Sequence, residues 1–302
     1  MKKLITYFIL AIIVLIVFIY RKDITTYITN NIIKQEVQEE LKFNEYSKKK
    51  NYEYVQITNN LSVTSKDKIK NIFYTILDSG IKSFSFYCDT KYKNCNNDIK
   101  EFFNNKDTLS NINNFVHPYN SFKNIRVSVT NYGKITLDIS HIYNDDEIKI
   151  VNDQIDKFIK ENINDNLSIN DKIKLFHDYI INNTKFDTAI ENSNDRLNST
   201  SYTAYGLLIN HLAICGGYTD TMSIYLDKLN IPNYRISTEE HVWNLVNINN
   251  NWLNLDVTWD DPVTSDNSDV LIYDYYLIST DELFKKDSKQ HNFNQNIYKE
   301  AI

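Results

Sequence analysis

The fold is decided by two neighbouring stretches of the chain, TAYGLLINHLAICGGYTDTMSIYLDKLNIP (residues 203–232) and HVWNLVNINNNWLNLDVTWDDP (residues 241–262). After Cys215, apolar residues recur on one face at helical spacing, as Tyr218, Met222, Tyr225, Leu226 and Leu229. Pro232 ends this helix because proline lacks an N–H and its ring clashes with the preceding turn. The second stretch is typical of two strands joined by an Asn-rich turn. Together they predict a helix followed by an antiparallel hairpin.

Cys215 is a candidate nucleophile because it is predicted to begin that helix. The macrodipole and the free N–H groups of a helix N-terminus stabilise a thiolate. Its own backbone N–H is a candidate oxyanion donor. Gly216 and Gly217 lack a Cβ, so another chain or a substrate can approach the backbone closely there. The alternative is a buried structural cysteine, since free cysteines are buried more often than they are reactive.

His241 and Asp256 are predicted to share one face of the hairpin. A two-residue turn at 249–250, where Asn tolerates positive φ, pairs Trp243 with Asp256. The same register pairs His241 with Thr258, which makes His241 and Asp256 diagonal neighbours about 5–8 Å apart at Cβ. The carboxylate then orients one imidazole nitrogen and leaves the other to face the thiol. A slip of one residue places Asp256 on the opposite face.

Other histidines fit the role of base less well. His211 precedes Cys215 by four residues, but no acid at a fixed spacing supports it. His177 lies on an amphipathic helix and indicates a structural role, and His117, next to Pro118, indicates a loop. For Asp256 the alternative is a solvent-facing strand residue, although Asp is disfavoured in strands.

The motifs around these residues resemble the transglutaminase-like superfamily. In its bacterial members a cysteine opens a helix in a C-x-G-[YF] context, a histidine lies in an H-x-W-N strand, and an aspartate lies in a W-x-x-x-D-x-T-W strand. All three patterns occur here in the same order. HDYIINNTKFD (residues 177–187) and YDYYLIS (residues 273–279) resemble the flanking helix and the strand that closes the core. The resemblance covers about residues 150–302.

The resemblance implies a papain-like α+β core in which the cysteine helix packs on an antiparallel sheet. It makes Cys215 the nucleophile, His241 the base and Asp256 the residue that orients the histidine. We assign Gly216, Gly217 and Trp243 to substrate binding; Gly216 replaces the larger polar residue of many relatives, and core packing is the alternative for Trp243.

The implied reaction is thiol acyl transfer from a carboxamide or peptide carbonyl. Water as acceptor gives a peptidase or amidase, and an amine gives a cross-linking transglutaminase. The sequence leaves this choice open. The alternative class is a non-catalytic surface protein that keeps the fold for binding or scaffolding. No cofactor is expected, and no metal, because Asp260-Asp261-Pro262 indicates a turn without further spaced oxygen ligands.

The N-terminus predicts a membrane anchor. Residues 4–20 are largely apolar and lie between Lys2-Lys3 and Arg21-Lys22. As a helix they span about 25 Å, slightly less than the hydrocarbon thickness of about 30 Å. A cleaved signal peptide is the alternative, but no small-x-small cleavage pattern follows. Basic residues flank both ends, so the positive-inside rule does not fix the orientation; an extracellular catalytic domain is the more common outcome.

We therefore predict a transmembrane anchor over residues 1–22, a helical stalk over 23–50, a smaller α+β module of unknown role over 51–145 and the catalytic domain over 146–302. The module begins with a strand-like segment at 52–57. Cys88 and Cys95, seven residues apart, form either a disulfide or two free thiols.

The charge distribution bears on the partners. The formal net charge is −6, and the basic N-terminal segment makes the remainder of the chain more acidic still. An acidic body excludes nucleic-acid backbone binding, which requires a basic face. The expected partners are a membrane, through the N-terminal helix, and a protein or peptide substrate associated with the cell wall.

Overall fold

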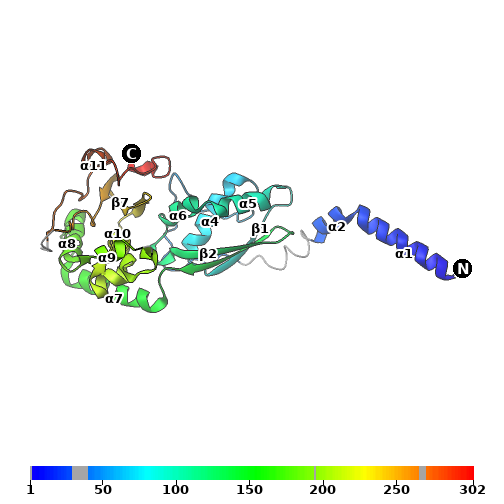
Figure 1. The fold of residues 1–302 in the computed structure, drawn as a ribbon, viewed down its shortest axis with the longest axis horizontal. Helices are drawn as coiled ribbons and strands as arrows, with labels where there is room; N and C mark the ends of the chain where they lie inside the picture. The colour runs from blue at the N-terminus through cyan, green and yellow to red at the C-terminus, as the bar shows by residue number, and fades with distance from the viewer. Residues whose placement is uncertain (1, 29–39, 194, 265–269) are drawn as a thin grey trace.

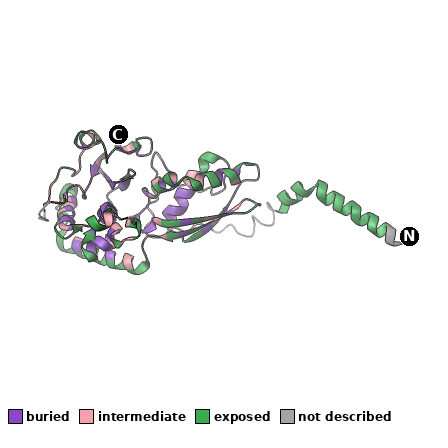
Figure 2. Cartoon of the chain, in the orientation of Figure 1, coloured by how far each residue is buried: buried purple, intermediate pink, exposed green. Residues whose placement is uncertain are grey.

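A computed structural model describes residues 2–28, 40–193, 195–264 and 270–302 (Figure 1). The folded body is α+β, as predicted, with two three-stranded antiparallel sheets, a short parallel pair and surrounding helices. Figure 2 shows that the buried residues gather within this body, whereas the two N-terminal helices are exposed along their length.

The first part of the body contains one sheet of order β1-β3-β2. Gly80 (φ 70°) ends the first helix and Gly133 (φ 75°) makes the β2–β3 turn, since both adopt the left-handed region. The elements are α4 (Lys66–Ser79), β1 (Ser83–Tyr87), α5 (Cys95–Asn104), α6 (Lys106–Asn113), a 3-10 turn (Pro118–Asn120), β2 (Phe122–Val129) and β3 (Lys134–His141).

The second part contains the sheet β6-β7-β8, on which α10 packs. Its helices are α7 (Asp145–Asn162), α8 (Ile169–Asn182), α9 (Thr188–Glu191), α10 (Cys215–Lys228) and α11 (Thr280–Lys286). Its strands are β4 (Lys185–Phe186), β5 (Leu212–Ala213), β6 (Asn233–Ser237), β7 (Val242–Ile248) and β8 (Asn251–Leu255). Short helical turns lie at Arg196–Asn198, Thr200–Tyr202, Gly206–Asn210 and Lys299–Ala301.

The β7–β8 register confirms the prediction made from the Asn-rich turn. Asn244 pairs with Leu255, which is the register that the prediction requires. The predicted pairs of Trp243 with Asp256 and of His241 with Thr258 lie just beyond this last pair and are not formed as strand pairs. Asn249 and Asn250 have φ of 53° and 67°, the combination that a type I′ turn requires. The second strand is shorter than predicted, however, because it ends at Leu255 rather than continuing to residue 259.

The sheet β6-β7-β8 packs against a hydrophobic core on each face. Trp243 and Leu245 of β7 belong to the core that the first part of the body forms around α4, and Val246 belongs to the core around α7, α8 and α10. This alternation follows from the two-residue period of a strand. The predicted division near residue 145 therefore separates segments that share one hydrophobic core.

Two helices precede the body, α1 (Lys2–Ile19) and α2 (Arg21–Ile28). Among the described residues no single helix has both the length and the apolarity of a membrane span. A helix pair, Ile5–Ile19 with Arg21–Ile28, reaches the required length and apolarity when the two helices are taken together, and they are bent by 68° relative to each other. The predicted anchor, residues 1–22, thus covers α1 and only the first two residues of α2.

The predicted helical stalk is seen as helix only to Ile28. Residues 29–39, which include Ile32, Ile33 and Val37, lie outside the described residues. Residues 40–50 form no helix and pack on the body, where the backbone N–H of Asn44 donates to Ser79 and the side chain of Ser47 donates to Asp78. The buried carboxylate of Asp78 thereby holds this segment against α4.

Two predicted strands are absent from the described residues. Residues 52–57 alternate like a strand but form a loop closed by a bond from Tyr52 N–H to the Val55 carbonyl. Residues 273–279 form only an isolated bridge, between Asn254 and Ile278, at the edge of β8. Cys88 and Cys95 form a disulfide, which resolves the alternative that their spacing left open.

Candidate active site

Cys215 is the first residue of α10 and lies buried, with 7% of its surface exposed. Ile214 precedes it in extended conformation, and its backbone N–H donates to the Ser201 carbonyl at 2.9 Å. No side-chain cap bonds to this helix start. The backbone N–H of Gly217 donates to the Ile214 carbonyl at 2.8 Å, so the N–H groups of Cys215 and Gly216 are the ones directed out of the helix end beside the thiol.

Gly216 and Gly217 are packed against the chain's own preceding segment. A Cβ at Gly216 would lie 2.6 Å from the Tyr202 ring, and a Cβ at Gly217 would lie 2.6 Å from the Ser201 carbonyl oxygen. The close approach predicted at these glycines thus comes from residues 201–202. Substrate contact at either glycine stays a prediction.

His241 lies just before β7, with its Nε2 2.5 Å from Asp256 Oδ2. Cys215 is the other side chain whose interaction with the ring bears on the pKa of His241. Burial acts to lower the pKa of His241, but the charges of Asp256 and Cys215 and its hydrogen bonds to them outweigh burial and raise it to about 10. The structure thus brings the three predicted residues together in the predicted order.

Trp243 supports the histidine from within the core. Its ring stacks on His241 with centroids 5.6 Å apart, and its Nε1–H donates to Asn254 Oδ1 at 2.9 Å. The side chain is only 1% exposed. It fixes the plane of the imidazole in this structure, and substrate contact by Trp243 stays a prediction.

Asp256 is a buried carboxylate with a donor on every side. Its Oδ1 accepts the backbone N–H groups of Thr258 (3.0 Å) and Trp259 (3.2 Å). These bonds make the turn that ends β8, which explains an aspartate at this place better than a strand position does. Burial acts to raise the pKa of Asp256, but the charges and hydrogen bonds of His241 and His291 outweigh burial and hold it well below its usual range.

His291 is a site residue that the sequence interpretation missed. It is fully buried, and its Nε2 lies 2.8 Å from the same Asp256 Oδ2 that His241 contacts. Its Nδ1 lies 2.8 Å from Asp287 Oδ2. The only signal in the sequence is the spacing of Asp287 and His291, four residues apart, in a segment without strand or helix periodicity.

The remaining histidines and acids have other partners. His177 Nε2 lies 3.2 Å from Asp260, and Tyr218 donates to Asp261, so both acids of the expected turn bind side chains of α8 and α10. His211 is exposed and bonds the Asn183 carbonyl. His117 is buried among residues far from Cys215 in the sequence, next to Tyr119 and Tyr46.

By ligand type, one group of the described residues could hold a metal ion: His241, Asp256 and His291, with ligand atoms within 4.8 Å of one another. Direct hydrogen bonds already join both imidazoles to the carboxylate. The three side chains therefore already have hydrogen-bond partners in one another, and no reaction step below uses a metal.

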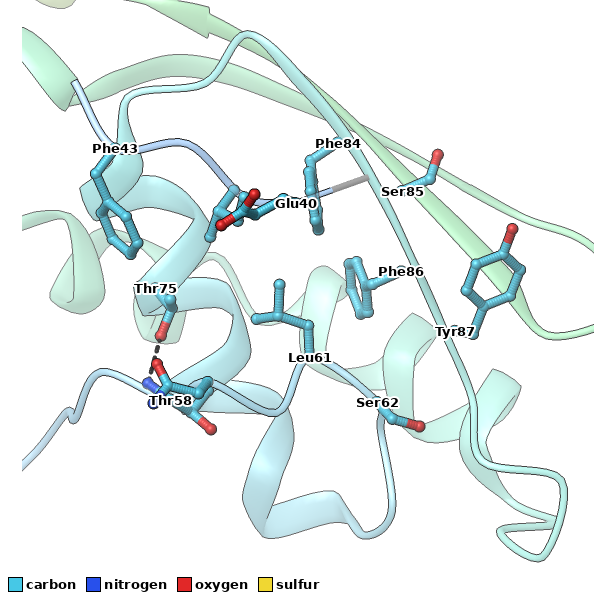
Figure 3. A pocket seen from close by; sticks show the side chains of 12 residues that line it. Glu40, Phe43, Thr58, Leu61, Ser62, Thr75, Phe84, Ser85, Phe86 and Tyr87 are labelled. Atoms are coloured by element: carbon cyan, nitrogen blue, oxygen red, sulfur yellow. Dashed lines mark hydrogen bonds between the residues drawn. The ribbon is translucent and has the colours of Figure 1, made fainter. Parts of the chain in front are cut away.

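A cavity of about 510 Å³ lies away from this site, beside the edge strand β1 (Figure 3). Its walls include the apolar side chains of Phe43, Leu61, Phe84 and Phe86. None of the residues that line it belongs to the group around Cys215.

Comparisons with known proteins add little to this geometry. No family model and no curated protein matches the chain. A solved structure described as "Crystal structure of a TGase" is similar over 46% of this chain and 45% of that one, at 18% identity and a TM-score of 0.34. The match spans less than half of that protein.

Proposed function

We propose that this chain is a thiol acyl-transfer enzyme of the transglutaminase-like kind. The observation that supports the proposal is the placement of His241, whose Nε2 lies 2.5 Å from the buried Asp256 carboxylate and whose pKa is raised to about 10 by Asp256 together with Cys215. Cys215 stands at an uncapped helix N-terminus. A nucleophile, a base and an orienting acid in this order are the parts that acyl transfer requires.

Before substrate binds, His241 holds the proton of the Cys215 thiol, so the site rests as an imidazolium–thiolate pair, in line with the raised pKa of His241. The sulfur attacks a carboxamide or peptide carbonyl, and the N–H groups at the start of α10 stabilise the resulting oxyanion. His241 returns the proton to the leaving nitrogen, which departs as an amine or ammonia and leaves a thioester on Cys215. Water or a primary amine then attacks the thioester, with His241 as base, and releases an acid or a new amide.

The proposed setting is the outer surface of a membrane, with α1 and α2 as the anchor and a cell-wall-associated protein or peptide as substrate. A disulfide between Cys88 and Cys95 is typical of an oxidising compartment and supports this orientation. Deleting residues 1–28 should then release the protein from sedimenting membranes. Retention of the shortened protein on membranes would contradict the proposed anchor.

The test of the reaction is incubation of the full-length chain with a primary-amine probe and glutamine-containing peptides. Both amine incorporation and hydrolysis are measured by mass spectrometry. Cys215→Ala should abolish both products, because it removes the attacking atom. His211→Ala, which changes an exposed histidine outside the site, is the matched control and should leave both unchanged.

Absence of both products from the unmodified chain, or their persistence in Cys215→Ala, would reject the enzyme and favour the binding or scaffolding alternative. The ratio of the two products assigns the acceptor, since it reports whether an amine competes with water at the thioester.

A further inference from the structure

A second buried histidine contacts the orienting carboxylate of the site. His291 Nε2 and His241 Nε2 lie 2.8 Å and 2.5 Å from the same oxygen, Asp256 Oδ2. The two imidazole rings meet edge to face, with centroids 5.2 Å apart. Since a carboxylate–histidine pair alone is enough to orient a base, the second histidine needs an explanation.

The partners of His291 define what it can donate. Its Nδ1 faces Asp287 Oδ2 at 2.8 Å, so each ring nitrogen faces a carboxylate oxygen. Ionised carboxylates only accept hydrogen bonds, and only an imidazolium donates from both nitrogens. The hydrogen-bond pattern therefore favours a cation at His291, between two anions.

Asp287 is itself held in place for this contact. Its carboxylate accepts backbone N–H bonds from Lys289 (3.2 Å), Gln290 (2.9 Å) and His291 (3.1 Å). The His291 ring is further enclosed by aromatic rings, stacked on Tyr275 at 5.4 Å and edge to face with Trp259 at 4.7 Å and Trp243 at 4.8 Å. The segment after α11 thus holds one imidazole rigidly against Asp256.

We propose that His291, held by Asp287, is a positioning residue of the acyl-transfer site, which fixes the Asp256 carboxylate and limits the negative charge that Asp256 presents to His241. The inference rests on the proposed function. Its chemical reason is that His241 must both take a proton from the thiol and return it to the leaving nitrogen. If Asp256 accepted a hydrogen bond from His241 alone, it would stabilise the His241 imidazolium more strongly. The transfer of the proton from His241 to the leaving nitrogen would then be slower.

Each element packed around His241 contributes titratable or charged groups that affect the pKa of its imidazole. Cys215 comes from α10, Asp256 from the end of β8, and His291 with Asp287 from the segment after α11. The exposed Glu239 and Glu240 precede His241 in the turn between β6 and β7. Of these groups, His291 is the one whose hydrogen bonds favour a positive charge, and it contacts the carboxylate directly.

The experiment measures the rate at which iodoacetamide alkylates Cys215 in the full-length chain, as a function of pH. Cys215 is the free cysteine of the chain, so mass spectrometry follows a single product. The alkaline step of the profile reports loss of the proton from His241, because the ion pair and the lone thiolate react at different rates. The step is compared in His291→Leu, His291→Gln and Asp287→Asn.

We expect His291→Leu to move the alkaline step upward by about one pH unit, since it removes a positive charge and a donor from Asp256. His291→Gln keeps a neutral N–H donor and should move it less. Turnover at neutral pH should fall about tenfold in kcat with KM little changed in His291→Leu. The glutamine variant should recover part of this loss.

An alkaline step that stays in place or moves downward in folded His291→Leu would overturn the proposal. If circular dichroism shows that His291→Leu does not fold, the test uses Asp287→Asn and His291→Gln instead. The alkaline step should move upward in both variants, and a step that stays in place would contradict the proposal. Nitrogen-15 NMR of the unmodified chain adds a direct check, because both ring nitrogens of His291 should carry a proton at neutral pH.

Failure of this inference is separable from failure of the proposed function, because alkylation needs no substrate. An upward shift without amine incorporation or hydrolysis supports the role of His291 in charge control and rejects acyl transfer. Amine incorporation or hydrolysis, together with an alkaline step that does not move in His291→Leu, supports acyl transfer and rejects the role of His291.

Discussion

At the residue scale, the two oxygens of Asp256 have separate tasks. Oδ1 accepts the two backbone N–H groups that turn the chain after β8, and Oδ2 accepts the two imidazoles. The first task is local and belongs to an Asx-type turn, for which Asp is well suited. The residue that closes the strand is thus also the one that orients the base.

The pH dependence of stability follows from this pairing. His241 has its pKa raised from 6.5 to about 10, so its contribution to stability is complete below pH 6.5 and is lost as the pH rises toward 10. Asp256 has a lowered pKa, so its contribution is present above its ordinary value of 3.8 and is lost at lower pH. We expect the difference in thermal midpoint between the unmodified chain and Asp256→Asn to be largest between these values and to shrink toward pH 10.

The measurement is thermal unfolding at a series of pH values for both proteins. Lys157→Ala, an exposed change on α7, serves as the control and should show a small difference that does not vary with pH. A difference for Asp256→Asn that is equally large at pH 10 would show that the pair does not titrate as described.

Prediction from sequence succeeded at single residues where local chemistry dictates the geometry. The register of β7 against β8 follows from two Asn residues that accept positive φ in a two-residue turn. His291 was not predicted because its partner Asp256 lies 35 residues away and no regular element carries it there. Tertiary packing of the last segment alone brings them together.

At the element scale, the start of α10 depends on two residues without a Cβ. Gly217 lies against the Ser201 backbone, which cannot rotate away as a side chain can. Alanine favours a helix over glycine by about 1 kcal/mol, but a Cβ 2.6 Å from a carbonyl oxygen forces the backbones apart. We expect Gly217→Ala to lower the free energy of unfolding by about 1–3 kcal/mol.

Urea denaturation of Gly217→Ala measures this change, with Lys157→Ala as the control at an unstrained helical position. A stability equal to or above that of the unmodified chain would mean that helix propensity outweighs the contact. In that event the segment 201–202 would be free to move away from Cys215.

A buried ion pair joins β6 to both parts of the body. Arg235 donates to Asp220 of α10 at 2.7 Å and to Ser121 at 2.7 Å. Tyr143 donates to the other oxygen of Asp220 at 2.8 Å. Replacing Arg235 by Met leaves the Asp220 carboxylate buried without its cation, which should destabilise the protein by about 3–5 kcal/mol.

Chemical denaturation of Arg235→Met tests this expectation, and Arg126→Met, at an exposed arginine of β2, is the matched control. The double variant with Asp220→Asn should lose less than the sum of the single changes, because no unpaired charge remains. Additive losses would show that Arg235 and Asp220 are not coupled.

The elements that sequence reasoning missed share one physical property. Residues 52–57 (YEYVQI) and 273–279 (YDYYLIS) are both rich in aromatic and β-branched or aliphatic side chains, as strands are, but in the described structure only Asn254 of β8 forms a bridge with the second of them. Such a composition suits a partly buried surface, whatever hydrogen bonds the backbone makes. By contrast, α7 and α8 begin at capping boxes, which are local signals in the sequence.

At the scale of the whole molecule, one sheet serves two hydrophobic cores. Tyr234, Ile236 and Leu245 are fully buried and pack with α4 and the first sheet, although they lie in the region assigned to the catalytic domain. Val246 and Leu255 of the same sheet pack with α7, α8 and α10. Sequence patterns locate each element but do not state which core an apolar face joins, so the shared sheet was not predictable.

The shared sheet predicts how a fragment of residues 146–302 will behave. Without the first part of the body, the apolar face that carries Tyr234, Ile236 and Leu245 would meet water, and Arg235 would lose its bond to Ser121. Burying each such side chain contributes about 1.5–3 kcal/mol, a large fraction of the stability of a domain. We expect the fragment to aggregate or to unfold without cooperativity, whereas residues 40–302 should unfold in one cooperative transition. Calorimetry and light scattering compare the two, and a soluble, cooperatively folding fragment with normal Cys215 alkylation would show that the second core supports the site by itself.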